Sequence, residues 1–147
     1  MQAAAPVAAA TPTMEVGYVT NFASHQLGKA FQLGATGLRR YDCSGLVYRT
    51  FYASGLLAKI GGSRRTAQGY YHWFASRGLA SRSNPHVGDL VTWAHRGQKV
   101  SHIGIFVGYN RWGQPMAISA LINPYGVSRH RVSGINVPFK AYLHVRF

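Results

Sequence analysis

Acidic residues are nearly missing from this 147-residue sequence, which has 3 Asp and Glu against 16 Lys and Arg. The three are Glu15, Asp42 and Asp89. So few carboxylates count against the acid and base pair of most glycoside hydrolases, and against Mg²⁺ or Ca²⁺ sites. The formal net charge of +13 instead predicts a surface that attracts polyanions: nucleic acid, anionic lipid or an acidic cell-wall polymer.

Cysteine is also scarce, because Cys43 is the only one. A single Cys excludes an intramolecular disulfide and a thiolate-rich zinc site. A site made of several of the seven His residues stays open, but they show no HxxxH or HExxH spacing, and we predict no metal and no other cofactor. No apolar stretch is long enough to span a membrane, and no internal repeat is present. If the chain carries out chemistry, Cys and His are the remaining residues to do it.

The N-terminal segment is rich in Ala, Pro and Thr and can bury little apolar surface. We therefore predict a flexible lead-in over residues 1–15 and one domain over residues 16–147. The lead-in lacks the basic start and the long apolar run of an intact secretory signal. We interpret it as what is left after a signal or an upstream domain has been removed.

The periodicity of apolar residues predicts helices first and strands afterwards. Helical spacing covers residues 16–30, 43–54 and 66–76, and Asp42 is placed to cap the second helix, which stops at Gly55. The later segments are short, rich in branched and aromatic residues, and separated by Gly, Pro or Asn: DLVTWAH, HIGIFVGY, PMAISAL, GVSRHRV and AYLHVRF. This order predicts an α+β domain with an antiparallel sheet.

Cys43 is a candidate nucleophile because of its place in the predicted second helix. In the first helical turn, the backbone N–H groups and the helix dipole favour negative charge, which predicts a lowered thiol pKa. The alternative is a buried cysteine that acts only as a small apolar residue. His102 opens a predicted strand near a turn, where a rigid scaffold often holds a catalytic residue, although any single His can equally be structural.

Four sequence blocks resemble a known family. LGKAFQLGAT (27–36), DCSGLV (42–47), GDLVTW (88–93) and SHIGIFVG (101–108) are similar, in this order, to blocks of the NlpC-type cell-wall cysteine peptidases. The resemblance runs from about residue 22 to 132 and implies a permuted papain-like domain, with N-terminal helices packed on an antiparallel sheet. In such a domain Cys43 attacks an amide carbonyl as thiolate, and His102 serves as general base and then general acid.

The resemblance also implies a substrate and a location. Family members cleave stem peptides of bacterial peptidoglycan, often between γ-D-glutamate and the diamino acid. The implied partner is peptidoglycan or another anionic wall polymer, and the implied location is secreted or wall-associated. Asp42, Ser44 and Ser101 match substrate-binding positions, with Asp42 expected to meet the free amine of the stem peptide. Arg39 and Arg40 either meet a substrate carboxylate or are solvated, and Asp89 is expected to be structural.

Two positions depart from the family pattern. Phe31 stands where the family has a Tyr whose hydroxyl helps to hold the oxyanion, and Tyr41 is a possible substitute. Ser119 stands where the family has the residue that orients the catalytic His, with Asn123 and His130 as nearby alternatives. We predict Cys43, His102 and Ser119 as the catalytic residues.

Two other classes of function stay open because of these departures. One is a wall-binding domain with little or no hydrolytic activity. The other is an enzyme of the same fold acting on another amide or thioester, such as an amidase, a toxin or an acyltransferase. Specific nucleic-acid binding is not expected, because no DNA or RNA fingerprint accompanies the basic charge.

Overall fold

Helices occupy much of the first 75 residues in the computed structural model, which describes residues 8–147. They are α1 (Pro12–His25), α2 (Cys43–Ala53), the 3-10 helix η1 (Leu57–Ile60) and α3 (Ala67–Ala75). The bounds of α2 and α3 confirm the predicted helices to within one residue at each end. No helix in the described part of the chain is long and apolar enough to cross a membrane.

The first helix begins earlier than its apolar pattern predicts. It starts at Pro12, not at residue 16, and ends at His25, not at residue 30. The hydroxyl of Thr11 caps it by accepting a hydrogen bond from the Met14 N–H (3.2 Å), and Pro12 lies in the first turn, where its missing N–H costs nothing. Of the predicted lead-in over residues 1–15, residues 1–7 lie outside the described residues and residues 12–15 are helical.

Six strands form an antiparallel sheet in the order β3-β8-β4-β5-β6-β7. Their bounds are β3 (Ala80–Ser81), β4 (Leu90–Trp93), β5 (His102–Tyr109), β6 (Pro115–Leu121), β7 (Gly126–Arg131) and β8 (Phe139–Leu143). A separate parallel pair joins β1 (Ala30–Phe31) to β2 (Arg40–Tyr41). The predicted α+β class with an antiparallel sheet is confirmed.

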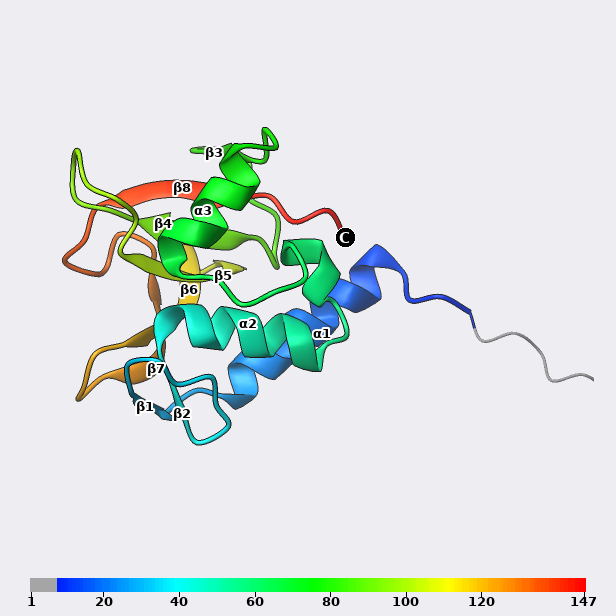
Figure 1. Cartoon of the computed structure of the whole chain (residues 1–147), viewed down its shortest axis with the longest axis horizontal. Helices are drawn as coiled ribbons and strands as arrows, with labels where there is room; N and C mark the ends of the chain where they lie inside the picture. Colours follow the sequence, from blue (N-terminus) through cyan, green and yellow to red (C-terminus); the bar gives the residue numbers. More distant parts are fainter. Residues whose placement is uncertain (1–7) are drawn as a thin grey trace, which may run out of the picture.

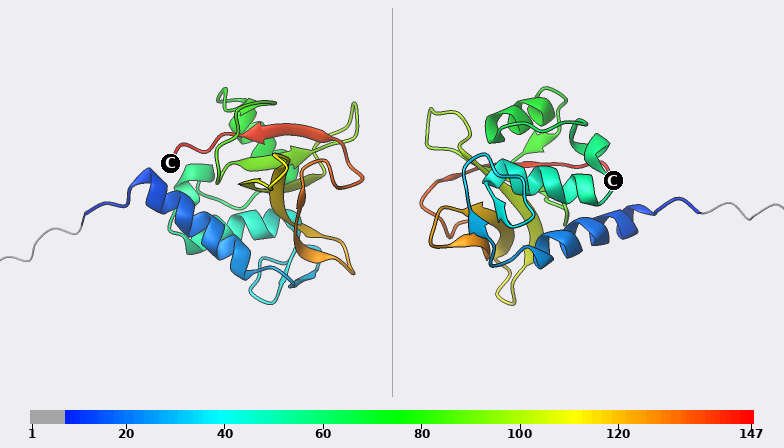
Figure 2. Two further views of the ribbon diagram at one scale, coloured as in Figure 1. Left: turned by 180° about the vertical axis from the view of Figure 1, so that it is seen from behind. Right: turned by 60° about the horizontal axis from the view of Figure 1, so that its bottom comes forward.

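The sheet separates two apolar clusters. The larger cluster lies between the helices and one face of the sheet, and it includes Leu46 of α2 and Ile103 and Ile105 of β5. The smaller cluster lies on the other face around Trp93 and Phe106. Figures 1 and 2 show α1 and α2 running side by side on the same flank of the sheet. This packing brings the N-terminus of α2 to the first residues of β5.

Candidate active site

Cys43 is the first residue of α2, and the local backbone points donors at its sulfur. Asp42 caps the helix by accepting from the Gly45 N–H (2.6 Å). The backbone N–H groups of Cys43, Ser44 and Ile103 face the thiol. The Ile103 N–H is free to do so because the pairing of β5 with β6 begins only at Ile105. The thiol therefore lies against the backbone of the residue that follows His102.

The pKa of the Cys43 thiol is raised from its ordinary value, not lowered. Burial is the main cause, and the nearby negative charge of Asp42 acts in the same direction. The backbone N–H groups of Ile103, Ser44 and Cys43 favour the thiolate but do not outweigh burial. The predicted lowering of this pKa is thus wrong, because Cys43 is half-buried between the buried residues Asp42 and Ser44, and the loss of hydration outweighs the effect of the helix N-terminus.

His102 is the first member of a chain of hydrogen bonds that crosses three strands. Its Nε2 lies 2.9 Å from the Ser119 hydroxyl, which lies 2.7 Å from Nε2 of His130. Nδ1 of His130 lies 2.8 Å from the backbone carbonyl of Arg131. The ring of Trp93 supports both imidazoles, at 5.1 Å from His102 and 5.7 Å from His130 between ring centroids. Ser119 is fully buried, while the two histidines are partly exposed.

The last acceptor in this chain fixes the position of every proton when both imidazoles are neutral. A carbonyl can only accept, so Nδ1 of His130 carries the hydrogen and its Nε2 is an acceptor. Ser119 must then donate its hydroxyl hydrogen to His130 and accept from Nε2–H of His102. Nδ1 of His102 is left as the unprotonated ring nitrogen. This is the tautomer that a general base toward a thiol requires.

Burial also keeps the two histidines neutral. Burial, the larger cause, and the neighbouring His130 together lower the pKa of His102 to about 4. The pKa of His130 is lowered as well, mainly by burial. With a raised thiol pKa and lowered imidazole pKa values, Cys43 and His102 rest as thiol and imidazole at neutral pH. They do not rest as a thiolate–imidazolium pair.

The structure separates the three residues considered for orienting His102. Ser119 contacts the ring directly, and His130 acts through Ser119. Asn123 does not reach His102, because its side-chain amide binds the backbone N–H (3.3 Å) and carbonyl (3.2 Å) of Phe31.

Tyr41 is fully buried, and its hydroxyl donates to the side-chain carbonyl of Gln26 at 2.8 Å. Its hydroxyl is therefore committed to an internal bond and does not stand in for the Tyr that Phe31 replaces.

Two of the three predicted substrate-binding residues, Asp42 and Ser44, flank Cys43 in the sequence. Asp42 and Ser44 line a cavity of about 390 Å³ whose other walls are Leu33, Gly34, Arg64, Arg65 and Thr66. Sequence reasoning missed Arg64, whose Nη2 forms a salt bridge with Asp42 (2.9 Å) and a hydrogen bond with the Ser44 hydroxyl (3.3 Å). Ser101 is exposed directly before His102.

Arg39 and Arg40 are exposed at the other side of Asp42. Neither lines the cavity beside Cys43. Arg40 makes only a long hydrogen bond, at 3.4 Å, to the side chain of Gln32.

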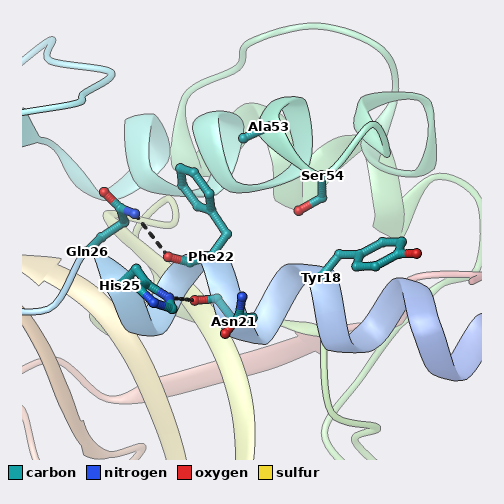
Figure 3. A pocket seen from close by; sticks show the side chains of 7 residues that line it. All are labelled: Tyr18, Asn21, Phe22, His25, Gln26, Ala53 and Ser54. Atoms are coloured by element: carbon teal, nitrogen blue, oxygen red, sulfur yellow. Dashed lines mark hydrogen bonds between the residues drawn. The ribbon is translucent and has the colours of Figure 1, made fainter.

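A larger cavity, of about 600 Å³, lies away from Cys43 (Figure 3). Its walls come from one face of α1 and from the C-terminal end of α2, where Ala53 is ten residues, or about 15 Å, along the helix from Cys43. Two of its polar side chains bond to the backbone of α1: His25 to the Asn21 carbonyl (2.8 Å) and Gln26 to the Phe22 carbonyl (3.0 Å). No catalytic group in the described residues faces this cavity.

One group of side chains has the composition of a metal site. His86, Asp89 and His144 have possible ligand atoms within 4.8 Å of one another. Asp89, however, is buried and already accepts from Nδ1 of His144 (2.9 Å) and from the backbone N–H groups of His86 (2.8 Å) and Val145 (2.9 Å). Its carboxylate joins the turn before β4 to the end of the chain, as expected of a structural residue.

Comparison with known proteins agrees with this geometry. The model of the NlpC/P60 family matches residues 28–141. The chain is 36% identical over 87 residues to probable endopeptidase p60 of Listeria innocua, a match that covers 58% of this chain and 16% of the relative. It is 28% identical over 122 residues to probable peptidoglycan endopeptidase LytE of Bacillus subtilis, covering 80% and 34% of the two chains.

The fold has solved counterparts. An NlpC/P60 family protein from Bacillus cereus superposes with a TM-score of 0.72 at 17% identity, over 88% of this chain and 40% of that one. The chain thus spans a sixth to a third of the length of the two relatives compared by sequence and less than half of this structure.

Proposed function

The chain belongs to the NlpC/P60 family, and from that premise we propose that it is a cysteine peptidase that hydrolyses amide bonds in peptidoglycan stem peptides. The observation that carries the proposal is the thiol of Cys43 at a helix N-terminus, against the backbone N–H of Ile103, which directly follows a histidine whose Nε2 is held by Ser119 and His130. The names of p60 and LytE, as an endopeptidase and a peptidoglycan endopeptidase, support the same reaction class. Retention of both Cys43 and His102 argues for an enzyme rather than a binding domain.

In the proposed reaction, Cys43 attacks as its proton leaves. Sγ forms a bond with the substrate carbonyl carbon while Nδ1 of His102 takes the thiol proton, because the resting pair is neutral. His102 then returns this proton to the leaving amine, the C–N bond breaks, and a thioester to Cys43 remains. A water molecule, deprotonated by His102, hydrolyses the thioester and restores the thiol.

Ser119 and His130 act through His102 and touch no substrate. When His102 becomes an imidazolium, its Nε2–H bond to Ser119 becomes charge-assisted and stronger. His130 accepts the Ser119 hydrogen and so keeps the serine lone pair pointed at His102. The two residues therefore hold the ring and stabilise the charge that develops on it, without a carboxylate.

The oxyanion is stabilised by backbone groups in this proposal. The N–H groups of Cys43 and Ser44 are at the positive end of α2 and face the sulfur. Phe31 contributes no hydroxyl at the family's Tyr position. We therefore expect slower turnover than in a relative with that Tyr, by analogy with the loss of one oxyanion donor elsewhere, which costs roughly a hundredfold or more.

The proposed substrate is the stem peptide, with cleavage between γ-D-glutamate and the diamino acid, and the proposed place of action is outside the membrane at the cell wall. The net charge of +13 supports this, since an anionic wall polymer would concentrate the protein at its substrate. The bond itself rests on the family resemblance of the blocks around Cys43 and His102.

The first experiment is incubation of the wild type and Cys43→Ala with purified peptidoglycan, with released fragments identified by mass spectrometry. We expect new amine and carboxyl ends with the wild type and none with Cys43→Ala, and the fragment masses identify the bond. Ser128→Ala serves as the matched control, because its hydroxyl bonds only to the nearby backbone carbonyls of Tyr125 and Gly126. Salt-resistant wall binding without cleavage by the wild type would contradict the proposal and favour a binding domain.

A further inference from the structure

The cavity beside Cys43 is electrostatically different from an amine-binding site. Three charged side chains line it, and two of them are arginines, Arg64 and Arg65, against the single carboxylate of Asp42. Because the guanidinium of Arg64 bonds directly to that carboxylate, the acid is neutralised where a substrate would meet it. An incoming ammonium group would have to displace Arg64 before it could pair with Asp42.

The carboxylate of Asp42 is also short of free lone pairs. Oδ1 accepts from the Gly45 N–H (2.6 Å), Arg64 Nη2 (2.9 Å) and the Ser44 hydroxyl (3.3 Å). Oδ2 accepts from the Gly34 N–H (2.7 Å). Four donors therefore occupy the two oxygens, and Asp42 serves to cap α2 and to hold the loop at Gly34.

Arg64, by contrast, keeps donors to spare. Only its Nη2 takes part in hydrogen bonds, to Asp42 and Ser44, so Nε and Nη1 have no partner among residues 8–147. These N–H groups lie on a side chain that is 33% exposed and lines the cavity. A guanidinium edge with free N–H groups matches the two oxygens of a carboxylate. Arg65 is less free, because its Nη1 binds backbone carbonyls, including that of Gly61 at 3.2 Å.

We propose that Arg64 binds a substrate carboxylate close to the cleaved bond and excludes a free amine from Asp42. The inference rests on the proposed function, in which the glutamate that supplies the reacting γ-carbonyl also carries an α-carboxylate. It sets a specificity: stem peptides with this carboxylate free are substrates, and those with it converted to the amide are poor ones. The N-terminal amine of the peptide is not recognised.

The test uses four synthetic γ-D-glutamyl-diamino acid peptides. They differ in whether the glutamate α-carboxylate is free or amidated and in whether the N-terminus is free or acetylated. We expect the wild type to favour the carboxylate over the amide by roughly 10- to 100-fold in kcat/KM, the strength of a charge-assisted hydrogen bond, and to ignore acetylation. Arg64→Ala should lose the carboxylate preference and gain a several-fold preference for the free amine, because Asp42 is released. Arg64→Lys keeps the charge but not the paired N–H donors of the guanidinium, and should show an intermediate carboxylate preference.

Arg40→Ala is the matched control, since it removes one exposed arginine outside the cavity and should leave both preferences unchanged. Calorimetric binding of the same peptides to Cys43→Ala, with and without Arg64→Ala, separates binding from cleavage. Carboxylate-selective binding without cleavage by the wild type would refute the proposed function and leave this inference standing. Binding or cleavage by the wild type that prefers the amide or the free amine, or no binding of any peptide, would overturn the inference.

Discussion

Replacing Ser119 by Ala tests the hydrogen-bond chain that orients His102. The substitution removes one buried hydroxyl and leaves Nε2–H of His102 and Nε2 of His130 without their partner. An unsatisfied buried group costs about 1–3 kcal/mol. If this cost falls on the imidazolium in the transition state, kcat should drop by roughly 5- to 150-fold. KM should stay unchanged, because Ser119 is fully buried and touches no substrate.

The tautomer supplies a readout that does not depend on activity. Long-range ¹H–¹⁵N spectra should show His102 with its hydrogen on Nε2 and His130 with its hydrogen on Nδ1 in the wild type, as the Arg131 carbonyl requires. In Ser119→Ala, His102 should populate both tautomers. A wild-type His102 protonated on Nδ1 would refute the reasoning, since that ring could not accept the thiol proton.

A double-mutant cycle tests whether Ser119 and His130 act on His102 as one hydrogen-bond chain or independently of each other. Because the only hydrogen bond from His130 toward His102 runs through Ser119, the double variant Ser119→Ala/His130→Ala should at neutral pH be no slower than Ser119→Ala alone. Ser128→Ala is the control, since Ser128 pairs with Ser119 across β6 and β7 but bonds only to the Tyr125 and Gly126 carbonyls. Additive losses in the double variant would show that His130 has a separate role.

The remaining predictions concern pH, reactivity and stability. The acid limb of kcat/KM should lie near pH 4, where His102 gains its proton. It should move to higher pH in His130→Ala, because removal of His130 raises the pKa of His102. An acid limb at the same pH in both proteins would contradict this electrostatic coupling. Alkylation of Cys43 by iodoacetamide should rise steadily above neutral pH, because its thiol pKa is raised, whereas a plateau at pH 5–7 would reveal a preformed ion pair. Asp89→Asn should lower the free energy of unfolding by about 3 kcal/mol in urea titrations, because an NH2 group replaces one of the two buried oxygens that accept from the His86 and Val145 N–H groups and from His144, while kcat of the folded protein stays unchanged. Gly45→Ala should lower it by about 1–3 kcal/mol, because the new Cβ would meet the Ala35 carbonyl, and an equally stable variant would show that the loop yields.

Much of the scaffold could be predicted because its signals are local. The Asp42 cap and the apolar run after it define α2, and residues 115–121 form β6 as their alternation and turn residues predict. The prediction for the last strand, over residues 141–147, was misplaced, since β8 covers Phe139–Leu143. The two-residue strands β1, β2 and β3 are too short to show a period, because they depend on partners distant in sequence.

The sequence named candidate members of the site but not its electrostatics. Cys43 and His102 were named from their blocks and Ser119 from the strand that follows, and the structure brings His102 and Ser119 into contact. The direction of the thiol pKa shift depends on how deeply the packed helix covers the sulfur, which no sequence pattern reports. Arg64 was missed for a similar reason: it lies 22 residues after Asp42 in a loop, and only the tertiary fold joins the two.

The Arg131 carbonyl that ends the hydrogen-bond chain belongs to the main chain, so no point mutation can delete it. The donor-to-acceptor direction of the whole hydrogen-bond chain is therefore set by the backbone. The side chains between need only have one group that donates a hydrogen bond and one that accepts it. Ser119 and His130 can then be exchanged together during evolution or in the laboratory, for any pair that fits the space and preserves this direction. A library that randomises positions 119 and 130 jointly should yield active solutions that one-at-a-time substitution never reaches.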